Sequence, residues 1–537
     1  MIDPDTRLRP TDALVSPLLT DFYELTMAYG YWKCGKHDDP AVFDLFFRET
    51  PFGGAFAVFA GLEEVLRFLS DYHFDDERIA FVRDILPGRD QRFFDWLRTV
   101  DCGRVRVRAL PEGSLAFPRV PLITVEGPLA VAQLLETTLL TLVNYPTLVA
   151  TNAARFRLAA GPDKGLIEFG LRRAQGPDGG VSASRYTYVG GFDATSNVLA
   201  SYLFREIPPR GTQAHSWVQS FLGLEAVRDA RLADSRGRPH DFTSLVLACR
   251  DELGFTHTNE GELAAFIGYA LAWPDGFLAL VDTYDTLNSG VPNFLTVALA
   301  LHRLGYRPLG IRLDSGDLAY LSKEARRMFR EVSERFSVDF SGLTIVASSE
   351  INEQVLLALR QQGHEIDVFG VGTHLVTCQA QPALGGVYKL VEVNGRPRIK
   401  LSQDPGKVII PGRKEAYRLV SAEGWPILDL MTQTGEAAPQ RGKRVLCRHP
   451  FDQTKKVYVT PSEVVPLLQC VWDGKPNPSA LRPLTEVREY VSEQLAHMRP
   501  DHLRALNPTP YKVSLSERLY QFLHQLWRQE APIVEMR

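Results

Sequence analysis

The chain has 537 residues, and at about 100 to 200 residues per domain this length predicts two to four domains. Its hydrophobic fraction of 45% and charged fraction of 23% are typical of globular proteins and exclude a disordered or integral membrane protein. The formal net charge of -4 supplies no global field that would attract nucleic acid or an anionic membrane. Any anion site must therefore be local.

The cysteines and the apolar stretches predict a cytosolic (cytoplasmic) protein. The six cysteines are scattered singly, without the close pairs that zinc or a redox dithiol requires. Residues 1–10 lack the apolar core of a secretory signal. Residues 129–150 are apolar but carry Gln133, Glu136 and Pro146, so we expect a buried helix and no membrane segment.

The first region, residues 1–150, is predicted to be an α+β domain. Strand-like runs occupy residues 41–47 and 103–108. A helix is expected after Thr20 or Asp21, either of which can act as the N-cap. Tyr23, at the start of this helix, could stack on a ligand or on a neighbouring subunit if it is exposed.

Residues 151–377 are predicted to form a parallel β/α domain. Short apolar runs that end in Gly, Asp, Ser or Arg are followed by helical segments, which is the pattern of parallel β/α folds. These runs cover residues 166–169, 186–190, 277–281, 309–313, 343–347 and 366–369. Because parallel β/α barrels build their sites at the carboxyl ends of the strands, we expect the site there.

After residue 378 the strand-like alternation returns, as in residues 386–393 before the turn Asn394-Gly395. The first part of the region 378–537 could be a new domain or could rejoin the sheet of the N-terminal domain, and the sequence leaves both open. The last hundred residues, with a helical run at 514–528, are expected to form a smaller C-terminal subdomain.

His215 is a candidate nucleophile. It lies among small residues in the segment Gly211-Thr212-Gln213-Ala214-His215-Ser216, which leaves its ring open to a partner. A neutral imidazole can accept a phosphoryl group near pH 7. The alternative is that a lone histidine is a structural residue.

Two strand ends carry groups suited to anions. Gly370-Val371-Gly372-Thr373 offers backbone amides and a hydroxyl to a phosphate, although glycine pairs after strands are often only turns. Phe169 and Arg172 would suit an aromatic acid, with a ring for stacking and a cation for the carboxylate, although neighbouring arginines are usually solvated.

The segment 312–317 also carries a group suited to anions, Arg312, together with the carboxylates of Asp314 and Asp317. Alternation along a strand directs Arg312 and Asp314 to one side. The guanidinium can bind a carboxylate or phosphate, and the aspartates can hold Mg²⁺ on pyrophosphate or bind ribose hydroxyls. The alternative is a salt-bridged loop in which Asp317 caps the next helix.

Six segments in this order resemble the nicotinate phosphoribosyltransferase family, one of the type II phosphoribosyltransferases. They are the segments at residues 19–27, 168–173, 190–197, 211–216, 312–317 and 370–373. The resemblance implies an α/β fold with an irregular β/α barrel, an α+β N-terminal domain and a smaller C-terminal subdomain. It also implies a homodimer whose active sites lie where the subunits meet.

The resemblance also implies roles for individual residues. In the family, the histidine that corresponds to His215 is phosphorylated by ATP. The expected catalytic residues are His215, Arg312 and Asp317, and Asp317 is also the candidate metal ligand. The expected substrate-binding residues are Tyr23, Phe169, Arg172, Thr212, Arg312, Asp314, Ser348, Gly370, Gly372 and Thr373. Among these, Tyr23, Thr212 and Arg312 would contact nicotinate, and Thr373 would hold the 5-phosphate of the sugar.

The implied reaction joins nicotinate to phosphoribosyl pyrophosphate, with ATP as co-substrate and Mg²⁺ or Mn²⁺ as the metal. A nicotinamide phosphoribosyltransferase and a non-catalytic relative with a binding role are the alternatives. The arginine-rich site favours the acid over the amide, and the residue set favours catalysis. A quinolinate enzyme is disfavoured, because chains of that family are much shorter.

Overall fold

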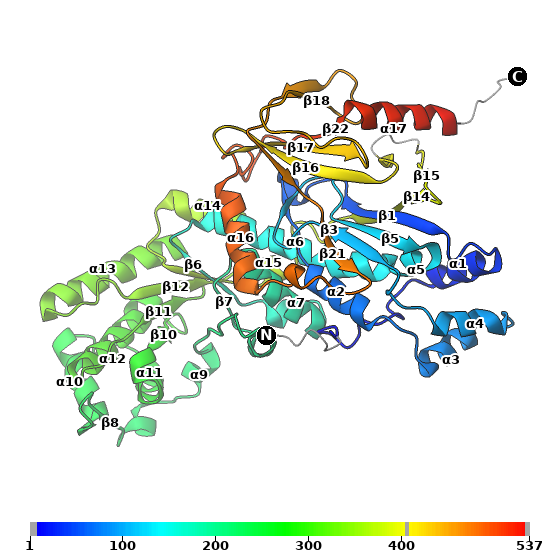
Figure 1. The fold of residues 1–537 in the computed structure, drawn as a ribbon. Helices are drawn as coiled ribbons and strands as arrows, with labels where there is room; N and C mark the ends of the chain where they lie inside the picture. Colours follow the sequence, from blue (N-terminus) through cyan, green and yellow to red (C-terminus); the bar gives the residue numbers. More distant parts are fainter. Residues whose placement is uncertain (1–7, 403–406, 532–537) are drawn as a thin grey trace, which may run out of the picture. The chain divides into compact units, whose positions relative to one another are not determined.

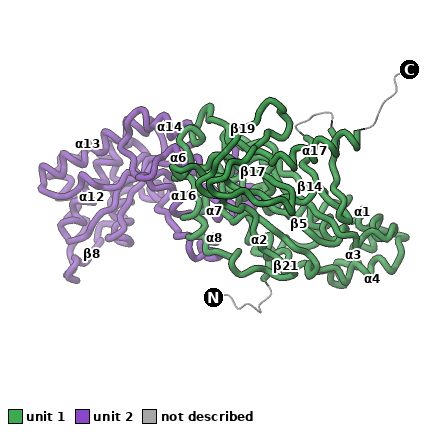
Figure 2. The backbone as a smooth tube through the Cα atoms, turned by 45° about the horizontal axis from the view of Figure 1, so that its top comes forward, with its two compact units in different colours: residues 1–154, 189–191, 380–537 green, residues 155–188, 192–379 purple. Residues whose placement is uncertain are grey.

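A computed structural model describes residues 8–402 and 407–531 of the chain. They divide into two compact units, coloured separately in Figure 2. Unit 1 comprises residues 1–154, 189–191 and 380–537, and unit 2 comprises residues 155–188 and 192–379. Within the described ranges, every helix is too short or too polar to cross a lipid bilayer.

Unit 1 contains a six-stranded sheet to which distant parts of the chain contribute. Its strands, in spatial order, are β15 (Arg396–Pro397), β14 (Gly386–Val393), β1 (Pro40–Phe47), β5 (Ile123–Pro128), β3 (Arg106–Ala109) and β21 (Gln469–Asp473). β14 pairs antiparallel with β1, so a strand from beyond residue 378 completes a sheet that begins near the N-terminus. Asn394 and Gly395 both have positive φ, as a tight hairpin turn between β14 and β15 requires.

A second six-stranded sheet in unit 1 is formed entirely by the C-terminal region. Its strands, in spatial order, are β19 (Lys456–Val459), β18 (Val445–Arg448), β22 (Val513–Ser516), β17 (Pro426–Gln433), β16 (Lys414–Val420) and β20 (Glu463–Pro466). Inside it, the buried guanidinium of Arg418 donates to both oxygens of Asp429, each at 2.9 Å. This pairing satisfies both charges away from water.

Helices flank these sheets along the chain. In unit 1 they are α1 (Phe22–Lys33), α2 (Leu62–Asp71), α3 (Asp76–Ile85), α4 (Gln91–Arg98), α5 (Leu129–Leu134), α16 (Leu484–Ala496), α17 (Glu517–Glu530) and most of α6 (Glu136–Ala160). A small pair of strands, β2 (Ala57–Val58) and β4 (Leu115–Ala116), completes the unit.

Unit 2 is built on a six-stranded sheet in which all paired strands are parallel. In spatial order the strands are β10 (Leu278–Leu280), β11 (Gly310–Leu313), β12 (Thr344–Ser348), β13 (Val368–Val371), β6 (Gly165–Glu168) and β7 (Ala194–Thr195). The connections carry helices, all but α8 labelled in Figure 1: α7 (Gly176–Val189), α8 (Val198–Leu203), α9 (His215–Gln219), α10 (Phe242–Leu253), α11 (Glu260–Ala272), α12 (Val291–Arg303), α13 (Leu318–Phe336), α14 (Glu353–Gln362) and α15 (Thr373–Val376). A hairpin of β8 (Arg231–Ala233) and β9 (Pro239–Asp241) precedes α10.

An irregular segment, residues 208–213, joins the two edge strands of this sheet. At one end the amide of Thr195 in β7 donates to the carbonyl of Pro208, and its own carbonyl accepts from Arg210. At the other end the side-chain amide of Gln213 donates to the carbonyl of Leu278 in β10 at 3.0 Å. The sheet is therefore bridged into a barrel by a segment without regular strand structure, which confirms the predicted irregular β/α fold.

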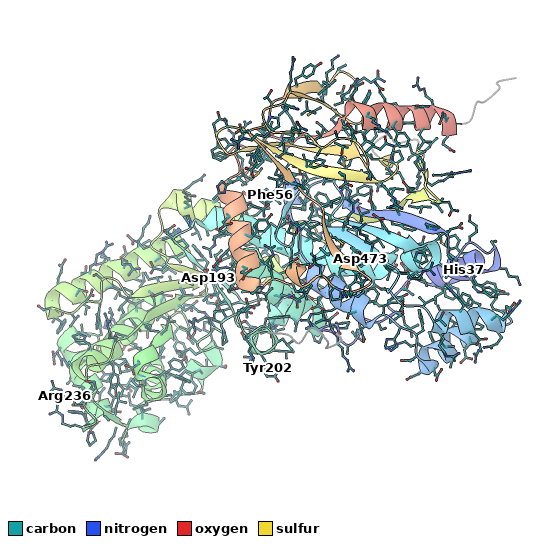
Figure 3. The ribbon with its side chains drawn as sticks, in the orientation of Figure 1. His37, Phe56, Asp193, Tyr202, Arg236 and Asp473 are labelled. Carbon is teal, nitrogen blue, oxygen red and sulfur yellow. The ribbon has the colours of Figure 1, made fainter. Side chains whose placement is uncertain are left out.

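Part-buried carboxylates fix the start of two strands in this barrel. The carboxylate of Asp193, labelled in Figure 3, accepts from Arg157 and from the amide of Leu166 at the start of β6, both at 2.8 Å. Asp367 does the same for β12, accepting from Arg326 at 2.7 Å and from the amide of Ile345 at 2.8 Å. Each carboxylate thus anchors one strand.

Two local predictions were wrong. The run at residues 186–190 was predicted as a strand, but it belongs to the end of α7 and the turn after it. The run at residues 514–528 was predicted as helical throughout, whereas its first three residues lie in β22. Short apolar runs fit a buried strand and a buried helix equally well, so neighbouring elements decide between them.

Gly310 at the start of β11 provides a test of this sheet. A Cβ on Gly310 would lie 1.9 Å from the carbonyl oxygen of Thr344 in β12, and its φ of 155° disfavours a side chain. We expect Gly310→Ala to lower the stability of unit 2 by about 1–3 kcal/mol, the usual cost of overpacking. Urea denaturation would measure this, with Gly342→Ala as the control, because a Cβ there meets nothing within 4 Å.

Candidate active site

His215 lies between two polar groups that come from the ends of neighbouring strands. It is the first residue of α9. Its Nδ1 is 3.1 Å from the hydroxyl of Thr283, beyond β10, and its Nε2 is 3.6 Å from Asp314 Oδ2, beyond β11. The side chains of His215 and Asp314 keep 39% and 31% of their exposure. The imidazole is therefore oriented by the protein and still open to a ligand.

Arg312 presents a guanidinium beside this imidazole. Its Nη1 donates to the carbonyl of Gln213 at 3.2 Å, and its Nη2 is 3.5 Å from Asp314 Oδ1. The guanidinium also lies over the ring of Phe169, 5.8 Å from its centre. Its Nε is buried and has no hydrogen-bond partner among the described residues. An aromatic face and an incompletely paired cation thus lie together, as an aromatic carboxylate requires.

Asp314 is the most connected side chain of the cluster. Its Oδ1 accepts a hydrogen bond from the hydroxyl of Ser348 at the end of β12, besides its contacts with His215 and Arg312. Its backbone amide donates to Asp282 Oδ2 at 3.1 Å. Asp314 therefore connects the ends of three adjacent strands.

The glycine loop, residues 370–373 at the end of β13 and just beyond it, continues the cluster. Ser348 pairs in register with Gly370. A Cβ on Gly370 would lie 2.4 Å from the ring of Phe169, so only glycine lets this ring lie against the strand end. Gly372 follows, and Thr373 begins the short helix α15, with its side chain half-buried. The glycine loop and Arg312 therefore contact the same aromatic ring.

The structure gives other predicted site residues different surroundings. Asp317 caps α13, since its Oδ1 accepts from the amide of Tyr320 at 3.0 Å; this is the alternative raised from the sequence. Arg172 and Thr212 are exposed, and it is Arg312 whose guanidinium lies over Phe169. Tyr23 belongs to unit 1, where its side chain is 44% exposed at the start of α1.

Sequence reasoning did not assign a role to Asp282 and Thr283. Asp282 Oδ2 accepts from the amide of Asp314 and from the hydroxyl of Ser315, while its Oδ1 is buried without a partner among the described residues. Thr283 contacts His215 directly. The signal was available, because both residues follow an apolar strand next to the strand that precedes Asp314, and adjacent parallel strands bring their carboxyl ends together.

The carboxylates also bear on metal binding. The described ranges contain no group of three or more His, Cys, Asp or Glu side chains arranged to bind a metal. Magnesium, however, often uses only one or two carboxylates and takes its remaining ligands from phosphates and water. Asp282 Oδ2 accepts from the backbone amide of Asp314, and Asp282 Oδ1 has no partner among the described residues, so the Asp282 carboxylate fits that mode.

Two buried glutamates, Glu168 and Glu262, hydrogen-bond to residues near the cluster. Glu168 accepts from the amide of Gly170 and from the hydroxyls of Ser184 and Thr195, and burial raises its pKa. Glu262 is fully buried in α11, and burial raises its pKa to about 7 despite hydrogen bonds from Ser289 and Asn293.

Glu262 makes stability depend on pH. Because its pKa is higher in the folded chain than in the unfolded one, the folded state binds more protons, and stability falls as pH rises from about 4.5 to about 7. We expect Glu262→Gln to remove a decline on the order of 3 kcal/mol, because each pKa unit corresponds to about 1.4 kcal/mol. Urea denaturation across this pH window would measure it, and Glu260→Gln, exposed on the same helix, should keep the decline.

Comparison with known proteins gives one family along the whole chain. Residues 18–144, 299–454 and 413–523 match the models for the nicotinate phosphoribosyltransferase N-terminal domain, family and C-terminal domain. Nicotinate phosphoribosyltransferase of Dictyostelium discoideum is 54% identical over 99% of this chain and 91% of its own length. The Homo sapiens protein of that name is 48% identical over 99% of both. The crystal structure of human nicotinic acid phosphoribosyltransferase matches with a TM-score of 0.85 at 47% identity, covering 94% of this chain and 99% of that one.

Proposed function

Because the chain belongs to the nicotinate phosphoribosyltransferase family, we propose that the cluster around Asp314 is where it joins nicotinate to phosphoribosyl pyrophosphate. The chain is a phosphoribosyltransferase that acts on nicotinate and makes nicotinate mononucleotide for NAD synthesis. One observation carries the assignment of the site: Arg312 lies over the Phe169 ring and beside the Asp314 carboxylate that faces His215.

Nicotinate would bind between the aromatic and cationic groups. Its ring would stack near Phe169, and its carboxylate would accept hydrogen bonds from Arg312, whose buried Nε has no partner within residues 8–402 and 407–531. By analogy with the family we also propose Tyr23 and Thr212 as nicotinate contacts and Arg172 as a contact for carboxylate or pyrophosphate. The sugar 5-phosphate would bind the loop of Gly370, Gly372 and Thr373, where closely approaching backbone can donate amides.

The transfer step is a displacement at the anomeric carbon. The pyridine nitrogen forms a bond to that carbon as the bond to pyrophosphate breaks, and positive charge develops on the sugar, as in glycoside cleavage. The carboxylate of Asp314 would stabilise this charge or bind the ribose hydroxyls, while Ser348 holds its orientation. Bound magnesium or manganese would neutralise the pyrophosphate charge, held by Asp282 and Asp314, with Asp317 as the weaker candidate.

ATP would act through His215. The imidazole would accept the terminal phosphoryl group of ATP, and the roughly two negative charges gained would alter which conformation binds substrates tightly. Family membership also leads us to propose a cytosolic homodimer with shared active sites.

His215→Asn tests the phosphohistidine. We expect the variant to keep a basal rate of nicotinate mononucleotide formation but to lose stimulation by ATP, because an amide cannot carry the phosphoryl group. ADP release with and without both other substrates would be measured beside product formation. His257→Asn, at an exposed position, should behave as wild type. ATP hydrolysis by His215→Asn that still rises with the other substrates would contradict the proposal.

Arg312→Lys tests the nicotinate contact. An ammonium cannot reproduce the fork of a guanidinium over Phe169, so we expect the KM for nicotinate to rise about ten- to a hundredfold. Steady-state kinetics with nicotinate varied would show this. Arg360→Lys, exposed on α14, is the matched control. An unchanged KM would remove Arg312 from the nicotinate site.

A further inference from the structure

A cavity of about 300 Å³ in unit 1 is lined by helix α16, by the edge strand β20 and by neighbouring segments. Tyr490, Glu493 and Gln494 line it from α16, and Glu463 lines it from β20. Pockets for small molecules begin at about this size, whereas a buried water needs only a small fraction of it. The lining residues belong to unit 1, whereas the cluster around Asp314 belongs to unit 2. The occupant of the cavity therefore follows from its own walls.

Much of the wall is apolar. Leu115, Leu467 and Met498 line the cavity and are buried. Val465 lines it from β20 and keeps 37% of its exposure, and α16 adds the half-buried ring of Tyr490. Covering this surface with the apolar part of a ligand is favourable, because apolar area is then removed from water.

Hydrogen bonds of Gln494 hold the walls together. Its side-chain amide donates to the carbonyl of Gly113 at 2.8 Å, and its Oε1 accepts from the amide of Leu115 at 3.1 Å. Arg418 of β16 donates to the same Oε1 at 3.4 Å and to the carbonyl of Leu115 at 2.8 Å. The helix, β4 and β16 are therefore connected around the cavity. A preformed site of this kind loses little free energy to ordering when a ligand binds.

The charges on the walls are unbalanced. Arg418 provides a permanent positive charge in the lining, and Asp429 already neutralises it through two hydrogen bonds. The carboxylates of Glu463 and Glu493, both exposed, make no hydrogen bond or ion pair to the described residues. His497 donates from Nδ1 to the backbone carbonyl of Glu493 at 2.7 Å, so this contact leaves the Glu493 carboxylate unpaired.

Arg482 is a second guanidinium in this region, and it is already used. It donates to the carbonyl of Glu112 and lies 4.8 Å from the centre of the Tyr490 ring. Arg482 lies outside the cavity lining. The lining therefore keeps the negative charge of Glu463 and Glu493 beside an apolar wall.

We propose that this cavity binds an organic cation, a small amine with an apolar body and without acidic groups. The apolar walls bury the body, and the carboxylates of Glu463 and Glu493 attract the ammonium group. Nicotinate, phosphoribosyl pyrophosphate and ATP are all anions, so the same carboxylates disfavour the reactants proposed above. The ligand is a separate molecule, and the cavity is a second site.

Tryptamine and tryptophol serve as probes on the full-length enzyme, because they share an indole body and end in an ammonium and a hydroxyl group. We expect tryptamine to bind about tenfold more tightly, since each exposed carboxylate adds about a two- to fivefold preference for the cation. Isothermal titration calorimetry at low ionic strength would measure both dissociation constants, and added salt should reduce the preference. Equal affinity for the two probes, or no binding of tryptamine, overturns the proposal.

Substitution of the two carboxylates tests where the cation binds. In the double variant Glu463→Gln with Glu493→Gln, tryptamine should lose its tenfold preference, whereas tryptophol should bind as in wild type and so report an intact fold. Glu486→Gln is the control, because Glu486 is exposed on α16 about two turns before Glu493 and outside the lining. A preference that survives in the double variant, or an equal loss in Glu486→Gln, overturns the proposal.

Nicotinate distinguishes the cavity from the candidate active site. Saturating nicotinate should leave the affinity for tryptamine unchanged, because the two molecules carry opposite charges and bind at different places. Competition between them overturns the proposal, since tryptamine would then occupy the nicotinate site. These are measurements of binding, so they do not depend on turnover of nicotinate.

Discussion

The contacts of one carboxylate, that of Asp314, hold the candidate site together. It faces the imidazole of His215 with one oxygen and the guanidinium of Arg312 with the other, and it accepts from Ser348. A carboxylate can do this because two oxygens provide about four acceptor positions. Removing it would leave a half-buried guanidinium without its counter-charge and an imidazole without its fixed partner.

The parallel sheet explains why these groups meet. Adjacent parallel strands end at the same edge, so Thr283, Asp314, Ser348 and Gly370, each far from the next in sequence, become neighbours. The barrel is completed by the irregular segment 208–213, whose Gln213 contacts both β10 and Arg312. The segment that bridges the sheet therefore also places His215, two residues after Gln213, at the edge of the sheet.

The two buried glutamates next to this edge of the sheet reduce the stability of the fold. Glu168 satisfies an amide and two hydroxyls next to the Phe169 strand end, and Glu262 holds the turn after Thr283. Burial raises the pKa of both carboxyls, since the charged form is poorly solvated there. These hydrogen bonds hold the segments around the site in place, and the burial of the two carboxyl groups lowers the stability of the fold near neutral pH.

The sequence by itself determined the family, through six ordered segments. It also determined the parallel β/α fold and most of the strands, because an apolar run followed by Gly, Asp, Ser or Arg is a local pattern that can be read along the chain. It also brought forward His215, Arg312 and Asp314 as residues at strand ends, whose roles stay predictions. Only the tertiary structure decided the partners: Arg312 rather than Arg172 over Phe169, Asp317 as a helix cap, and Thr283 and Asp282 beside the imidazole and Asp314. It also placed residues 186–190 at the end of a helix and in the turn after it. The physical reason is that periodicity along a chain sets which way a side chain points, whereas its neighbours depend on strand order and on packing between residues distant in sequence.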